Sequence, residues 1–171
     1  MKNEQQKRKL TDCTSFDEIY DSVRSIIESG KPDVDSVREA LTSPHLSYDE
    51  RVFLGKWIEQ QAPDLRFDVN LTLAKACEFF YGEEDNFSSA LAFYQKAVAE
   101  APHRIEPYKY LAESYDPNTG LPQPSEILAI LKEGLRSHQD PRPLYTCLAL
   151  MYEKLGDAAM ATYYKKKSTE S

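Results

Sequence analysis

Apolar residues return at steps of three and four positions along almost the whole chain, as Val34, Val37 and Leu41 illustrate. A spacing of this kind places apolar side chains on one face of an α-helix. No stretch keeps the strict alternation of apolar and polar residues that is typical of a half-buried strand. The pattern therefore predicts an all-α protein.

Capping residues and prolines divide this pattern into short helices. Ser15 with Glu18, and Ser47 with Glu50, each form an S-x-x-E sequence, the capping box that marks the start of a helix. Prolines and polar loop sequences provide the remaining breaks. The predicted helices span roughly residues 15–29, 33–42, 47–61, 64–81, 87–101, 105–115, 124–137, 141–154 and 157–168.

The second half of the chain contains a pattern that returns. Its copies begin at LAKACEFFYG, YKYLAESYDP and LYTCLALMYE. In each copy, a helix carries small or medium-sized residues ahead of a tyrosine, which is Tyr81, Tyr115 or Tyr152. A turn and a second amphipathic helix follow. Short paired helices that recur at a regular period indicate a repeat architecture.

This pattern resembles the tetratricopeptide repeat, a unit of about 34 residues that folds as a helix, a turn and a second helix. The match is best over residues 71–102, and the positions that carry it are Ala74, Cys77, Tyr81, Ala90, Tyr94, Ala97 and Pro102. The resemblance implies an α-α superhelix, a solenoid of antiparallel helix pairs. In such a fold, Ala90 and Ala97 are expected where neighbouring helix backbones approach closely.

The resemblance also implies a division of the chain. Residues 64–171 would hold three repeats, at about 71–104, 105–140 and 141–168. Residues 13–63 would form N-terminal helices that are either a degenerate repeat or a capping hairpin, because Trp57 stands about where the repeat has alanine. Residues 1–12 are polar and basic, and we expect a disordered arm there.

Composition narrows the classes of function. The chain has 171 residues, the length of one ordinary domain, and a formal net charge of −7. An acidic balance repels phosphate backbones, so nucleic acid is a poor candidate partner. The N-terminal sequence MKNEQQKRKL has no apolar run behind it, so neither a signal peptide nor a membrane-inserted segment is expected. Three scattered cysteines without metal-ligand spacing favour a reduced, cytoplasmic protein.

No pattern in the sequence indicates an enzyme. His45, His103 and His138 fall in predicted loops, where the repeat geometry suggests no acids or thiols to complete a catalytic or metal site. The sequence has no glycine-rich phosphate loop and no G-x-S-x-G motif. We therefore expect no catalytic residues, no cofactor and no metal site.

In tetratricopeptide proteins, the first helix of each repeat lines a concave face that binds extended or helical peptides. The resemblance therefore implies a non-catalytic adaptor or scaffold that binds a protein or peptide partner. The positions that correspond to this face are Lys75, Phe79, Lys109, Glu113, Thr146 and Leu150, with Thr72, Glu106 and Tyr110 alongside. The carboxylate clamp of some family members is not expected, because Phe79 and Tyr110 stand where a clamp needs asparagines.

A second function remains open beside the adaptor. The chain is similar in size, acidity and repeat number to the cytoplasmic tetratricopeptide chaperones of type III secretion, which keep secreted or membrane-inserting clients soluble. Those chaperones follow their repeats with a further C-terminal helix. Here the repeats run to the end of the sequence, which favours the adaptor.

The last predicted helix, DAAMATYYKKK, is a candidate surface for self-association. Its apolar side, with Met160, Tyr163 and Tyr164, would be left partly open where no further repeat covers it. Either the lysines at 165–167 make this surface tolerable, or a second molecule or a partner covers it, most simply in a two-fold homodimer.

Overall fold

The computed structural model describes residues 10–30, 32–78 and 86–170, and these residues are largely helical. No strand forms among them, and a single isolated bridge joins Asp116 to Leu121. Two short 3-10 helices are present, η1 (Leu10–Asp12) and η2 (Pro63–Leu65). The α-helices are α1 (Phe16–Glu28), α2 (Val34–Leu41), α3 (Tyr48–Gln61), α4 (Arg66–Glu78), α5 (Asn86–Glu100), α6 (Glu106–Ser114), α7 (Pro124–Gly134), α8 (Arg142–Lys154) and α9 (Ala158–Thr169). The prediction of an all-α protein is confirmed.

Local capping explains why several of these helices begin where the sequence predicted. At the start of α3, the Ser47 hydroxyl accepts from the Glu50 backbone N–H, and the Glu50 carboxylate accepts from the Ser47 N–H in return. The predicted capping box is thus complete there. At the start of α1, Ser15 caps the Glu18 N–H, but the Glu18 carboxylate accepts from the Thr14 N–H instead.

The structure also differs from the predicted boundaries at two places. Residues 10–12 form η1, which packs against α1 and α2, so the expected disordered arm does not extend that far; residues 1–9 lie outside the described residues. Helix α7 ends at Gly134 rather than at 137, because the chain turns with the Ser137 N–H donating to the Gly134 carbonyl.

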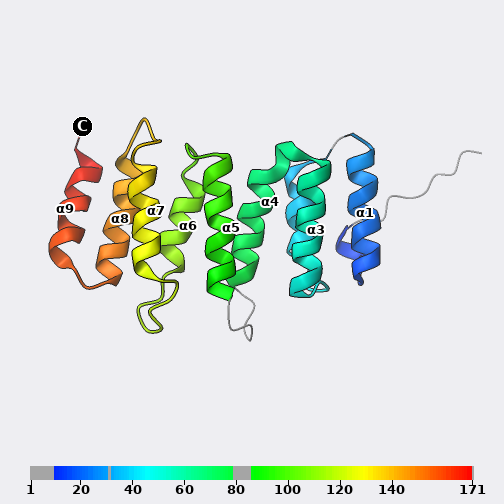
Figure 1. The fold of residues 1–171 in the computed structure, drawn as a ribbon, viewed down its shortest axis with the longest axis horizontal. Helices are drawn as coiled ribbons and strands as arrows, with labels where there is room; N and C mark the ends of the chain where they lie inside the picture. Colours follow the sequence, from blue (N-terminus) through cyan, green and yellow to red (C-terminus); the bar gives the residue numbers. More distant parts are fainter. Residues whose placement is uncertain (1–9, 31, 79–85, 171) are drawn as a thin grey trace, which may run out of the picture.

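The helices stand side by side in an elongated row that runs from α1 at one end to α9 at the other (Figure 1). Helices adjacent in sequence pack against each other, most extensively α4 with α5 and α8 with α9. In addition, α2 contacts α4, α4 contacts α6, and α6 contacts α8. Among the described residues, α3 with α5, α5 with α7, and α7 with α9 make fewer contacts than these even-numbered pairs do. The even-numbered helices therefore lie close together along one face of the row.

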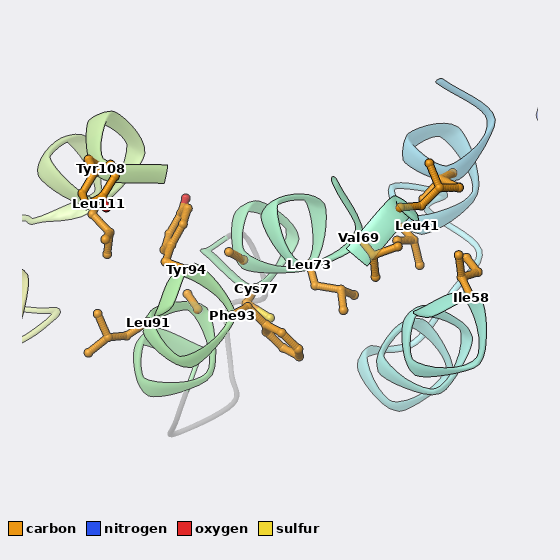
Figure 2. Packing of buried hydrophobic residues seen from close by; sticks show 14 of the residues in the cluster. Leu41, Ile58, Val69, Leu73, Cys77, Leu91, Phe93, Tyr94, Tyr108 and Leu111 are labelled. Carbon is orange, nitrogen blue, oxygen red and sulfur yellow. The ribbon is translucent and has the colours of Figure 1, made fainter. Parts of the chain in front are cut away.

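A main hydrophobic core extends along the row, and a smaller cluster of Phe67, Ala97 and Ala101 is separate from it. The main core includes Cys13 before α1 and Met151 in α8, together with buried residues of the helices between them. Figure 2 shows Val69 and Leu73 of α4 pointing toward α3 and α2. The helix α4 is thus buried on both sides, which explains why eight of its residues are buried.

Small residues mark the places where helices approach most closely. Ala90 and Ala97 of α5 are 1% and 0% exposed, as expected for close helix contacts. A side chain at Gly134 of α7 would lie 2.5 Å from the ring of Tyr108. In α3, a Cβ added at Gly55 would lie 2.7 Å from the Leu73 side chain. From the sequence, the small residue of this helix was expected at the position of Trp57, whereas the structure has it at Gly55, two positions earlier.

None of the helices in the described part of the chain combines the length and the apolar character needed to cross a membrane.

Candidate binding groove

A groove with a volume of about 770 Å³ opens on the face formed by the even-numbered helices. Helix α2 and the loop after it contribute Arg38, Thr42, Pro44 and Leu46 to its lining. Helix α4 contributes Asp68, Leu71, Thr72, Lys75 and Ala76. Arg51 of α3 and Tyr110 of α6 complete the lining. We refer to this site as the α2–α4–α6 groove.

The wall formed by α4 is a regular helical stripe. Its residues follow one another at alternating steps of three positions and one position, which keeps all of them on one side of the helix. Asp68 and Lys75 lie seven residues apart, which corresponds to about 10 Å along the helix axis. The wall therefore carries a negative charge at one end, a positive charge at the other, and Leu71 and Thr72 between them.

Arg51 holds the loop that forms one side of the groove. It is only 5% exposed, and its guanidinium donates hydrogen bonds to the carbonyls of Leu41, Ser43 and Leu46. These carbonyls belong to the end of α2 and the loop that follows, where backbone acceptors lack helical partners. Burial lowers the pKa of Arg51, but an arginine stays protonated at neutral pH. A buried positive charge thus lies beside the groove.

Lys75 and Tyr110 form the other side. The Lys75 ammonium lies 4.0 Å from the centre of the Tyr110 ring, a cation–π contact that joins α4 to α6. One turn further along α4, the Glu78 carboxylate accepts a hydrogen bond from the Tyr94 hydroxyl. Burial raises the pKa of Glu78, while the hydrogen bond from Tyr94 and the charge of Lys75 oppose that rise.

The structure brings only part of the predicted partner face together. Of the six positions, Lys75 lines the groove, and Thr72 and Tyr110, which were expected alongside, line it as well. Lys109 and Glu113 lie on α6 and face each other at 3.8 Å in an exposed ion pair.

The remaining predicted positions lie away from this groove or cannot be placed. The exposed Thr146 donates its hydroxyl to the Arg142 carbonyl of its own helix. Leu150 is half-buried and packs against the core, and Glu106 accepts hydrogen bonds from Arg104. Phe79 lies outside the described residues.

At the C-terminal end, the predicted self-association residues differ in exposure. Tyr163 is 52% exposed, whereas Met160 and Tyr164 are half-buried. The Tyr164 ring stacks on Tyr152 of α8, with centroids 5.6 Å apart. Lys165 pairs with Glu153, so it does not stand free over this surface. Self-association through these residues stays a prediction.

The groups of the described residues considered for chemistry are metal-ligand clusters, the buried cysteines and His138. No cluster of three or more histidine, cysteine or acidic residues that could hold a metal ion occurs in the described ranges. Burial raises the pKa of both Cys77 and Cys147 to about 11, which leaves little reactive thiolate at neutral pH. His138 packs edge-on against the Tyr108 ring, with Nδ1 3.0 Å from the Gly134 carbonyl. Both thiols and the imidazole thus lie against packed side chains.

Sequence reasoning missed the groove residues that lie before α4. Arg38 and Arg51 belong to the stretch that was read only as a degenerate repeat or a capping hairpin. One signal was present: Arg51 shares a helical face with Leu54 and Ile58, and all three side chains are buried. A charged residue on an apolar stripe indicates a group that binds backbone carbonyls or a ligand.

No family model matches this chain, and no curated protein matches its sequence.

Proposed function

We propose that this protein is a non-catalytic, tetratricopeptide-like adaptor that binds an extended segment of a partner protein in the α2–α4–α6 groove. The observation that carries the proposal is the groove itself, which lies between successive even-numbered helices. Its walls combine apolar surface from Leu71 and Ala76 with the aromatic ring of Tyr110. Aromatic and aliphatic anchors in a recess, with polar groups at the margin, suit peptide recognition.

Two further features support a peptide as the ligand. Thr42 and Pro44 at the margin are exposed, so the groove opens to solvent and can admit a chain that continues beyond it. The two sides of the groove are held by internal contacts, from Arg51 to the loop after α2 and from Lys75 to Tyr110. A groove that is organised before binding loses less conformational entropy when a ligand enters.

The experiment is selection of a random peptide library displayed on phage against the full chain. We expect enriched peptides whose affinity falls about tenfold or more in Tyr110→Ala, because this change removes an aromatic wall. Tyr163→Ala is the matched control, since it removes an equally large ring from the exposed C-terminal end. Circular dichroism must show unchanged helicity in both variants.

The outcomes separate the functions. Peptides that depend on Tyr110 but not on Tyr163 support the adaptor. The absence of any enriched peptide, or binding that both variants retain, would overturn the proposed groove. A chaperone of the type III secretion kind would instead keep an aggregation-prone, membrane-inserting client soluble and would show little preference among short peptides.

A further inference from the structure

We propose that the α2–α4–α6 groove selects a partner segment by an acidic side chain, aspartate or glutamate, that docks at Lys75. The inference rests on the proposed peptide-binding function and adds the chemical class of the segment. It depends on the charges that the groove gathers, on the state of Lys75, and on the position of Asp68.

The charge of the groove is opposite to that of the chain. The whole sequence has a net charge of −7, whereas the groove is lined by Arg38, Arg51 and Lys75 against the single acid Asp68. A recess between low-dielectric walls concentrates the field of the charges that line it. The groove lining therefore favours a negatively charged ligand, although the chain as a whole is acidic.

The three cations contribute in different ways. Arg51 donates its hydrogen bonds to backbone carbonyls. Its positive charge therefore attracts an anionic ligand at a distance, and other residues make the direct contact. Arg38 is exposed and pairs with Asp35 of its own helix at 3.1 Å. Exposed pairs of this kind are weak, so Arg38 acts mainly in steering an approaching anion.

Lys75 is the cation placed to contact the ligand. Its ammonium lies over the face of Tyr110, and none of the described acidic residues forms an ion pair with it. A ring face takes up the ammonium without using its hydrogen-bond donors in an ordinary hydrogen bond, and an entering carboxylate can accept these donors. The aliphatic part of the acidic residue would then lie against the Tyr110 ring. One contact thus supplies both charge pairing and apolar burial.

Asp68 restricts where the bound peptide can carry an acidic residue. It lies about 10 Å from Lys75 along α4, the length of about three residues in an extended peptide. A second acid at that distance would face Asp68 and be repelled. The groove is therefore expected to select one acidic position followed by apolar or uncharged residues, and to discriminate against a run of acids.

The test extends the phage selection. The library is displayed with linker residues on both sides, so that it presents internal side chains and no free peptide carboxyl terminus. Among peptides that need Tyr110, we expect enrichment of a single aspartate or glutamate. Synthetic peptides with this residue changed to asparagine or glutamine should bind about tenfold more weakly, the size of one desolvated charge pair.

Charge reversal in the protein sharpens the test. Lys75→Glu should lower the affinity for the acidic peptide by about tenfold or more, while Lys75→Arg retains most of it. Arg66→Glu, an exposed change of the same sign outside the groove lining, should have little effect at physiological salt. Selection repeated on Lys75→Glu should no longer enrich acids.

Failure of this inference differs from failure of the proposed function. Peptides that require Tyr110 but carry neutral or basic residues at every position would overturn the acidic preference and leave the binding function in place. An equal loss of affinity in Lys75→Glu and Arg66→Glu would also overturn it, because only the overall charge would then matter. If no selected peptide requires Tyr110, the groove itself is not the site.

Discussion

The two ends of the molecule use the same device, a cation that binds the carboxyl end of a helix, but they use it over different distances in sequence. Arg51 of α3 donates to carbonyls at and after the end of α2, five to ten residues away. Lys154 of α8 donates to the carbonyls of Ala112, Glu113 and Tyr115 at the end of α6, 39 to 42 residues away. Both cations donate hydrogen bonds to carbonyls that the end of a helix leaves without a partner. Both charges also interact favourably with the negative end of the helix dipole.

The difference shows how the row is held together at each end. Arg51 fixes a loop within a neighbouring pair of helices and, by doing so, shapes one side of the groove. Lys154 joins α8 to the end of α6, which lies two helices earlier in the chain. Burial also differs, since Arg51 is almost fully enclosed while Lys154 is half-buried. Removing the two cations should therefore have unequal effects.

The largest effect is expected for Arg51→Met. Methionine keeps much of the apolar volume but leaves buried carbonyls of α2 and its loop without their donor, and each such group costs about 1–3 kcal/mol. We expect the free energy of unfolding to fall by about 3 kcal/mol, measured by urea denaturation. The exposed Arg66→Met is the matched control and should change it by less than about 0.5 kcal/mol. Equal effects would contradict the role given to Arg51.

Alanine substitutions at two glycines, Gly134 of α7 and Gly55 of α3, test how tightly each region is packed. The Gly134→Ala methyl would meet the ring of Tyr108, which is fully buried and whose hydroxyl donates to the Pro102 carbonyl. The Gly55→Ala methyl would meet the methyl groups of Leu73, which form the far end of a flexible aliphatic side chain. We expect Gly134→Ala to destabilise the protein by about 2 kcal/mol and Gly55→Ala by clearly less, since overpacking is costly only where neighbours cannot move. Thermal unfolding of both variants checks this order.

Lys154→Met is expected to have a smaller effect than Arg51→Met. Desolvation already lowers the pKa of Lys154, so burying its charge offsets part of what its hydrogen bonds contribute. Glu113 is exposed, so water can also reach the carbonyl that Lys154 leaves there. We expect a loss of about 1 kcal/mol, with the exposed Lys56→Met as the control. If Lys154→Met lowered the free energy of unfolding as much as Arg51→Met does, the proposed difference between the two cations would be wrong.

The smallest effect on the free energy of unfolding is expected for a substitution of Glu78, which lies in α4 between the two regions. Burial raises the pKa of Glu78, so the folded protein holds this proton more tightly than the unfolded chain does. The stability from Glu78 is therefore complete below the ordinary value of 4.5 and declines as the pH rises through the raised pKa.

Glu78→Gln removes this titration, and its amide oxygen can still accept the Tyr94 hydroxyl. At pH 7 we expect a gain of less than about 1 kcal/mol in unfolding free energy, with no gain at pH 4. Glu100→Gln on the exposed side of α5 is the control. A gain that is the same at both pH values would contradict a titrating Glu78.

The helices could be predicted from the sequence because their signals are local. The Ser47 capping box and the prolines lie beside the ends that they define, and the predicted starts agree with the structure within two residues. The small residues Ala90 and Ala97 were also found correctly as buried contacts. The family, by contrast, stays a prediction.

The groove could not be predicted to the same extent, since it depends on distances between helices. Lys75 and Tyr110 were proposed from a resemblance, but their contact joins residues on different helices, 35 positions apart by their numbers. Arg38 and Arg51 were missed because the α2 and α3 region departs from the repeat pattern. Gly55 could have corrected that reading, since a glycine inside a helix commonly marks close packing.

The most direct test of the account is hydrogen exchange of the full chain with and without the tightest peptide from the phage selection. We expect slower exchange on binding over α2 with its following loop, α4 and α6, that is, residues 34–46, 66–78 and 106–114, and no change over α8 and α9. Protection confined to residues 142–169, with α2 and α4 unchanged, would contradict the claim that the α2–α4–α6 groove is the binding site.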